Sequence, residues 1–412
     1  MLTYIDLFAG AGGLSEGFIR SGFLPIAHVE QDPSACLTLK TRMAYHHLKK
    51  SGNFATYVAY LKGEISCDAL YSVAPKALRD SVINAKIAGR NLESIFTRID
   101  ALRHNRRIDV IIGGPPCQAY SLIGRVADSK KMKWDSRKFL YKFYAEFLDK
   151  YKPKMFVFEN VPGLYTAGEG KYYRQMMELF DSIGYETEDK ILDAADFGVI
   201  QHRRRVILVG WQKKLHISYP DFKKIENRWT IKDLFADLPP LKAGEVKDRA
   251  PYAGSPSDYL SLFEIRNGID FVTQNITRPH NEKDLAIYKL VIKKWKEENK
   301  NLKNDCIPAK IRTQKNITSF LDRFKVVRDD TLSHTMIAHI AKDGHHFIHP
   351  DESQMRSISV REAARIQSFP DDYKFEGSRA AVFRQIGNAV PPLVADAIAR
   401  GLLQLLKNNA PL

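Results

Sequence analysis

The fold is decided by the stretch Ile108-Asp109-Val110-Ile111-Ile112-Gly113-Gly114-Pro115-Pro116-Cys117-Gln118-Ala119-Tyr120-Ser121. Its first five residues are mostly apolar and predict a buried parallel strand. Two glycines then permit close backbone approach, and two prolines fix the direction of the chain just before Cys117. A thiol in this position lies where open α/β sheets bind ligands. The alternative is a buried cysteine that caps a strand, because free cysteines are usually buried. The flanking residues favour an exposed loop that presents a nucleophile.

Composition indicates a soluble globular protein, and its charge favours a polyanionic partner. The chain has 412 residues, 44% of them hydrophobic and 27% charged, which is enough for a large core and predicts two domains. No apolar run approaches a membrane span and no signal peptide is evident, so we expect a cytoplasmic protein with no membrane partner. Its four cysteines form no CxxC pair, so neither a metal site nor a disulfide framework is expected. The net charge of +15 favours a nucleic acid, although it could also be a surface kept basic for solubility.

The N-terminal stretch predicts a nucleotide-binding unit. An expected strand at residues 3–8 leads into the glycine turn Ala9-Gly10-Ala11-Gly12-Gly13 and a helix at residues 14–21. The G-x-G-x-x-G pattern is incomplete, because Ser15 holds its last position. A second strand, 23–30, ends in Glu30, where an acid can accept both ribose hydroxyls or simply face solvent.

Further strands are expected along the first half of the chain. We expect residues 33–96 to form an inserted helical subdomain, followed by a third short strand that ends at Asp100. Residues 154–158 predict another strand, after which Glu159 and Asn160 stand at its carboxyl end. Three arginines, residues 203–205, precede an apolar strand at 206–210. They are either a surface charge run or an anion-binding site edge.

After Trp211 the alternation of strands and helices disappears. Residues 213–355 are mixed, basic and rich in loops. Within them, Asp343-Gly344 stands between two segments with strand-like composition, which predicts a β-hairpin over 335–349. Helices are expected at 360–367 and 393–406, separated by a tight turn over 385–392.

Six of these blocks, in this order along the chain, resemble the DNA (cytosine-5-)methyltransferase family of bacterial restriction–modification systems. The matching blocks are Asp6 to Gly13, Gly114 to Ser121, Glu159 to Leu164, Gln201 to Arg205, Arg361 to Pro370 and Gln385 to Val390.

The resemblance implies a fold and a division of the chain. The fold is the doubly wound, mostly parallel α/β sheet of class I S-adenosylmethionine-dependent methyltransferases, with a smaller loop- and β-rich target-recognition domain. Residues 1–212 and 377–412 would form the catalytic domain, with the helical insertion at about 33–96. Residues 213–376 would form the target-recognition domain.

The resemblance also assigns roles to single residues. Cys117 would attack cytosine C6, which makes C5 nucleophilic enough to accept a methyl group. Glu159 would bond the ring N3 and the exocyclic amine, and Asn160 would position that loop. Arg203 and Arg205 would contact the flipped nucleotide and brace the catalytic loop.

S-adenosyl-L-methionine is the implied cofactor. Phe8, Gly10 and Gly12 would shape its pocket, and Glu30 would hold its ribose. Asp100 would bond the adenine amine, and Asn388 would close the methionine end. Gln31 departs from relatives that carry an aromatic residue after the acid.

The implied partner is double-stranded DNA, modified by a monomer that protects host DNA from a cognate restriction endonuclease. An RNA (tRNA) cytosine-5 methyltransferase, a catalytically inactive DNA-binding protein and a nicotinamide-dependent enzyme are the alternatives. The long basic 213–355 region and the block from Glu159 to Gly163 favour DNA. An intact set of Cys117, Glu159, Arg203 and Arg205 favours an active enzyme.

Overall fold

The protein is described by a computed structural model over residues 1–116 and 139–408. In these residues one mixed sheet has the strand order β3-β2-β1-β4-β5-β7-β6. The strands are β1 (Thr3–Leu7), β2 (Leu24–Glu30), β3 (Val82–Asn84), β4 (Val110–Gly113), β5 (Met155–Asn160), β6 (Tyr185–Asp193) and β7 (Arg204–Gln212). β1 to β5 pair with one another in parallel, whereas β7 is antiparallel to both β5 and β6. The predicted doubly wound, mostly parallel sheet is confirmed.

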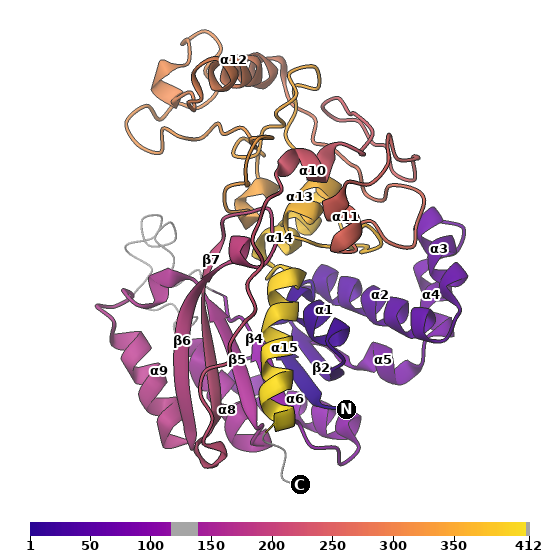
Figure 1. The fold of residues 1–412 in the computed structure, drawn as a ribbon, viewed down its shortest axis with the longest axis vertical. Helices are drawn as coiled ribbons and strands as arrows, with labels where there is room; N and C mark the ends of the chain where they lie inside the picture. The colour runs from indigo at the N-terminus through magenta and orange to yellow at the C-terminus, as the bar shows by residue number, and fades with distance from the viewer. Residues whose placement is uncertain (117–138, 409–412) are drawn as a thin grey trace.

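Two groups of helices cover the two faces of the sheet, because neighbouring residues of a strand point to opposite faces. Ile111 and Phe156 pack with one group, and Val110 and Val157 pack with the other. The first group is α6 (Gly89–Arg103), α8 (Leu140–Tyr151) and α9 (Lys171–Ser182); the second contains α1 (Gly13–Arg20) and α15 (Pro392–Asn408). Figure 1 shows α15, in yellow, lying along the sheet. The C-terminal helix therefore returns to the sheet, although the rest of the chain between β7 and α15 lies largely elsewhere.

The segment predicted as an insertion holds a strand of the central sheet. β3 pairs in parallel with β2, so the expectation that all of residues 33–96 form an insertion is wrong. The helices in this segment are α2 (Pro33–Lys50), α3 (Phe54–Lys62), α4 (Cys67–Val73) and α5 (Lys76–Asp80). α3 and α4 share a small core with Ile269 and Phe271, which come from the second half of the chain. These helices therefore support the region that lies above the sheet.

An upper lobe, defined here as residues 231–388, lies above the carboxyl ends of the strands (Figure 1). The rest of the described chain is called the sheet lobe. The upper lobe contains α10 (Ile231–Phe235), α11 (Asp258–Leu262), α12 (Glu282–Glu298), α13 (Val360–Ile366) and α14 (Arg379–Asn388). Its core includes Ala11 of the glycine turn and Ile200, so the two lobes are joined by buried contacts. The residues just after β7 stay on the sheet, where Tyr219 donates a hydrogen bond to the Ile207 carbonyl.

Two further local predictions are wrong. Residues 338–341 form a 3₁₀ turn, η8 (Ala338–Ala341), and no strand is found in the described region 335–349, although Gly344 does adopt a left-handed turn with φ of 77°. Residues 385–388 belong to α14, so the predicted tight turn is confined to the three residues before α15. The helical stretch 379–408 is long and apolar enough to cross a membrane, since its most apolar 18-residue window has a mean hydropathy of 1.3, but 61% of that window is buried inside the protein.

Candidate active site at the carboxyl edge of the sheet

The glycine turn after β1 is a tight backbone loop that only small or strained residues can form. Gly10 and Gly12 have φ of 55° and 83°, in the left-handed region that glycine adopts without cost. Phe8 has φ of 57°, which is unfavourable for a residue with a side chain and marks a functional turn. The Gly12 carbonyl accepts from the Glu16 amide at 2.8 Å, which starts α1. The turn therefore presents backbone groups at the end of a buried strand, as nucleotide-binding loops do.

Glu30 lies beside this turn at the end of β2. Its Oε2 accepts from the Gly10 amide at 2.8 Å, and its Oε1 accepts from the amides of Gln31 and Asp32 at 2.7 and 2.8 Å. Burial raises the pKa of Glu30, and these backbone donors oppose that shift. A carboxylate offers about four lone-pair sites, so the three amides leave room for one further donor.

Asn84 is a site residue that the sequence reasoning missed. The β2–β3 pairing places it directly beside Glu30. Its amide nitrogen donates to the carbonyls of Glu30 and Gln31 at 3.2 and 3.1 Å. β3 has only three residues, too few for a recognisable strand pattern, so the sequence carried no clear signal for this residue.

Asp6 is a second residue that the sequence reasoning left without a role. It is fully buried in β1, and neither carboxylate oxygen has a hydrogen-bond partner in the described part of the chain. Burial raises the pKa of Asp6 well above its usual range, and the charge of Glu30 adds to the effect. A buried carboxylate without a donor is costly, so this one is available to a ligand that carries a donor or a positive charge.

Glu159 and Arg205 form an ion pair at the end of β5. The Arg205 Nε lies 2.9 Å from Glu159 Oε1, and Glu159 is 9% exposed. The antiparallel register of β5 and β7 brings the two residues together, since Glu159 is opposite Ile207. A side chain at Gly114 would lie 2.6 Å from Glu159 Oε2. Glycine at this position therefore allows the carboxylate to rest against the loop that leads to Cys117.

Asn160 holds the same loop from the other side. Its Nδ2 donates to the Pro115 carbonyl at 3.3 Å, and its Oδ1 accepts from the Val161 amide at 2.9 Å. The structure thus brings Glu159, Asn160 and Arg205 together with Gly114 and Pro115. Cys117 itself lies outside the described residues.

Arg203 bonds to the upper lobe. Its guanidinium donates to the carbonyls of Met336 and Gly387 at 2.6 and 3.3 Å, and the residue is 2% exposed. Gln201 acts beside it, because its Oε1 accepts from the Met336 amide at 2.6 Å and its Nε2 donates to Gln367 Oε1 at 2.8 Å. Arg205 is thus the predicted arginine that pairs with the Glu159 carboxylate, whereas Arg203 fastens the upper lobe to the sheet lobe.

Asp100 does not lie at this site. It belongs to helix α6, so the prediction that it ends a third strand is wrong. It pairs with Arg103 at 2.8 Å and with Lys150 at 3.4 Å, and it lines a hollow with Ile108, which precedes β4. This is the amino end of the strands, opposite the glycine turn.

Asn388 is the last residue of α14 and is exposed, at the start of the link to α15.

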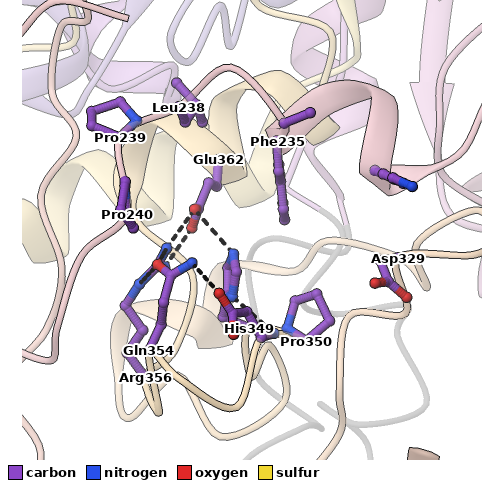
Figure 2. Close-up of a pocket in the computed structure, with 13 residues that line it drawn as sticks. Phe235, Leu238, Pro239, Pro240, Asp329, His349, Pro350, Gln354, Arg356 and Glu362 are labelled. Carbon is purple, nitrogen blue, oxygen red and sulfur yellow. Dashed lines mark hydrogen bonds and ion pairs between the residues drawn. The ribbon is translucent and has the colours of Figure 1, made fainter. Parts of the chain in front are cut away.

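A cavity of about 300 Å³ lies within the upper lobe, away from these residues. Figure 2 shows Phe235, the prolines and His349 around it, with Glu362 held by Arg356 and His349. Arg356 makes two 2.7 Å contacts to Glu362, so that carboxylate is committed to structure. In the described residues no three His, Cys, Asp or Glu side chains gather as metal ligands would.

Comparison with known proteins agrees with this geometry. The family model described as C-5 cytosine-specific DNA methylase matches residues 2–70 and 86–404. The chain is 41% identical to the type II methyltransferase M.Bpa9945I of Bacillus paralicheniformis, over 99% of this chain and 100% of that protein. It is 31% identical to the type II methyltransferase M1.HphI of Haemophilus parahaemolyticus, over 99% of this chain and 88% of that protein.

The fold is likewise shared with a solved structure. A crystal structure described as that of a DNA modification methyltransferase encoded within an E. coli prophage superposes with a TM-score of 0.65 at 24% identity, and covers 99% of this chain and 100% of that one.

Proposed function

The chain belongs to the C-5 cytosine-specific DNA methylase family and is a DNA (cytosine-5)-methyltransferase, and from this premise we propose how it works. It transfers a methyl group from S-adenosylmethionine to C5 of a cytosine flipped out of duplex DNA, through a covalent bond to Cys117. The observation that carries this proposal is the packing of Glu159 against Gly114, with Asn160 bonded to Pro115. Both contacts direct the loop that leads into Cys117 toward the acid.

The catalytic roles follow from the chemistry of cytosine. The Cys117 thiolate adds to C6, and C5 then takes the methyl group; loss of the C5 proton lets the sulfur–carbon bond break. Glu159 holds N3 and the exocyclic amine, which stabilises charge on the ring during attack. The ion pair with Arg205 fixes the orientation of Glu159 and places a positive charge beside the incoming base. Asn160 positions the loop, and Arg203 braces the two lobes.

The residues around the glycine turn fit S-adenosylmethionine. Asp6, buried and without a donor among the described residues, suits a cationic ligand, and the remaining acceptor site of Glu30 suits a ribose hydroxyl. Phe8, Gly10 and Gly12 shape the turn, and Asn388 is assigned to the methionine end. We assign the adenine amine to Asn84 instead of Asp100, because Asn84 stands beside Glu30. When bound, the cofactor supplies an electrophilic methyl group.

The substrate is assigned as double-stranded DNA. The net charge of +15 suits a polyanion, and the relatives named above are type II methyltransferases. Bases can be modified at C5 only after extrusion from the stack, so the two lobes must enclose a flipped nucleotide. On this basis the protein would protect host DNA within a restriction–modification system.

The test is incubation with methyl-labelled S-adenosylmethionine and mixed-sequence duplex DNA, followed by nucleoside analysis. We expect the label in 5-methylcytosine, and sequencing of the modified sites gives the target sequence. The Cys117→Ala variant should bind cofactor normally and transfer no methyl group; normal turnover would overturn the covalent mechanism. Label on transfer RNA and none on DNA would overturn the substrate assignment.

A further inference from the structure

Three consecutive residues between α13 and α14 connect the two lobes. Asp371, Asp372 and Tyr373 are each 0% exposed. Their side chains contact different parts of the molecule, although they are neighbours in the chain. A movement of one is therefore transmitted to the others, because a close-packed interior leaves no space to absorb it.

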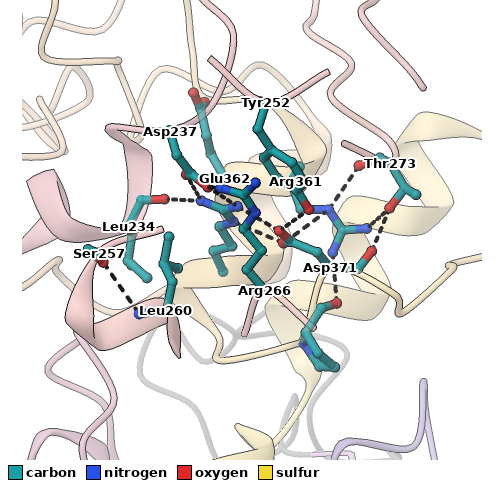
Figure 3. Close-up of polar contacts among 12 residues, drawn as sticks. Leu234, Asp237, Tyr252, Ser257, Leu260, Arg266, Thr273, Arg361, Glu362 and Asp371 are labelled. Carbon is teal, nitrogen blue, oxygen red and sulfur yellow. Dashed lines mark hydrogen bonds and ion pairs between the residues drawn. The ribbon is translucent and has the colours of Figure 1, made fainter. Parts of the chain in front are cut away.

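Asp371 faces the rest of the upper lobe (Figure 3). Its carboxylate accepts from Arg365 Nε and Nη2 at 2.9 and 2.6 Å and from the Tyr252 hydroxyl at 2.7 Å. Arg365 also donates to Asp237 Oδ1 at 2.5 Å. Burial alone would raise the pKa of Asp371, but Arg365 and Arg361 lower it, so the carboxylate stays charged.

Asp372 faces the sheet lobe. Its Oδ1 lies 2.9 Å from Arg42 Nη1. Arg42 in turn donates to both oxygens of Glu16, at 2.8 and 2.6 Å. Glu16 stands in the first turn of α1, immediately after the glycine turn.

Tyr373 reaches the glycine turn itself. Its hydroxyl donates to the Ala11 carbonyl. A side chain at Gly12 would lie 3.1 Å from the same hydroxyl. The guanidinium of Arg42 lies 4.6 Å from the centre of the Tyr373 ring. Tyr373 is thus the direct contact between this three-residue segment and the backbone assigned to the cofactor.

We propose that Tyr373 is a positioning residue that couples cofactor binding at the glycine turn to DNA binding by the upper lobe. The inference rests on the proposed function, since it takes the glycine turn as the cofactor site. Cofactor in the turn fixes the Ala11 carbonyl and hence the Tyr373 hydroxyl. Through Asp371 this holds the buried ion pair of Arg365 and Asp237, and with it the upper lobe to which we assign DNA binding. By linkage, DNA must tighten cofactor binding by the same factor.

The test measures coupling, using S-adenosylhomocysteine as an unreactive probe and a duplex of the target sequence found by nucleoside sequencing. DNA affinity is measured by fluorescence anisotropy with and without the probe. In the wild type we expect the probe to tighten DNA binding by about 5- to 150-fold, the usual range of such coupling. In Tyr373→Phe the ratio of the DNA affinity with the probe to the DNA affinity without it should fall toward one. The DNA affinity without the probe should be unchanged.

Tyr219→Phe is the matched control, because it removes a buried tyrosine hydroxyl that donates to a backbone carbonyl, that of Ile207, within the sheet lobe alone. It should keep the wild-type ratio. Equal loss of coupling in both variants, or no coupling in the wild type, would overturn the inference. If Tyr373→Phe does not fold, Asp372→Asn is measured in its place, because it interrupts the contact with Arg42 and should also lower the affinity ratio. An unchanged ratio in Asp372→Asn would overturn the inference. Absence of cofactor binding in the wild type would instead contradict the proposed function.

Discussion

Asp6 in β1 and Glu159 in β5 show how two acids of the same sheet acquire different properties. Asp6 has no donor in the described part of the chain and burial raises its pKa, whereas Glu159 is held by Arg205 at 2.9 Å. The first can accept a donor from a cationic ligand, and the second is oriented before any substrate arrives. An oriented group needs no reorganisation in the transition state.

Replacing Glu159 tests its proposed role directly. Glu159→Gln keeps the size of the side chain but removes the charge that pairs with Arg205. We expect the single-turnover rate of methyl transfer to fall by roughly 100-fold or more, the magnitude typical of a lost acid–base group. Glu188→Gln, at an exposed position on β6, is the control and should leave the rate unchanged. A normal rate in Glu159→Gln would remove this residue from the chemistry.

The adenine assignment is a second prediction at this scale. Asn84→Ala should weaken S-adenosylmethionine binding by about tenfold, the equivalent of one hydrogen bond of about 1 kcal/mol or slightly more. Asp100→Ala should bind the cofactor as the wild type does, because Asp100 pairs with Lys150 at the other edge of the sheet. Titration calorimetry measures both. The reverse result would restore Asp100 to the cofactor site.

The contact between α1 and α15 is so close that one helix must carry glycine. A side chain at Gly13 would collide with the Val390 carbonyl, and one at Gly17 would collide with the backbone of Ala395 and Asp396. The helix that leaves the cofactor turn is thus held against the C-terminal helix. This contact explains how the end of the chain supports its beginning.

Gly17→Ala tests that contact. In an exposed helix the change would stabilise the protein, by about 0.5–1 kcal/mol. Here the collision should instead lower the free energy of unfolding by about 1–3 kcal/mol, the cost typical of overpacking. Gly89→Ala, at the first residue of α6, is the control, because its nearest neighbour would be Phe143 at 3.9 Å. Urea denaturation compares the two, and a stabilised Gly17→Ala would show that the helices can separate.

At the scale of the whole molecule, buried and half-buried histidines make stability depend on pH. Burial lowers the pKa of His28, His280, His334 and His349 to about 4 each. In the unfolded chain these groups bind protons below about pH 6.5, whereas in the folded chain they do so only near pH 4. The free energy of unfolding should therefore be highest above pH 6.5 and decrease as the pH falls toward 4. At pH 5.5 each of these histidines should lower the free energy of unfolding by an amount on the order of 1 kcal/mol.

His349→Asn measures how much one histidine contributes to this pH dependence of stability. The Asn oxygen can replace His349 Nδ1, which accepts from the Asp351 amide at 3.1 Å. The free energy of unfolding should then change less between pH 7 and about 5.5 than in the wild type. His216→Asn, at an exposed position, should keep the wild-type dependence. An identical dependence in all three proteins would mean that His349 is protonated in the folded state.

The sequence by itself determined the sheet strands that carry the site, the glycine turn and the family. These features are local: apolar runs form strands, and Gly and Pro fix turns within a few residues. That is why the positions of Glu30, Glu159 and Asn160 at strand ends could be read directly.

Only the tertiary structure decided which polar residues meet. Residues 96–100 form part of α6, because Ile95, Phe96 and Ile99 lie on one helical face against the sheet. The true third strand has three residues and exists because the edge of β2 supplies its hydrogen bonds. Arg203 and Arg205 look equivalent in the sequence, but Arg205 lies in β7 and pairs with Glu159, whereas Arg203 precedes the strand and bonds to the upper lobe. Such contacts join residues far apart in the chain, and no local pattern encodes them.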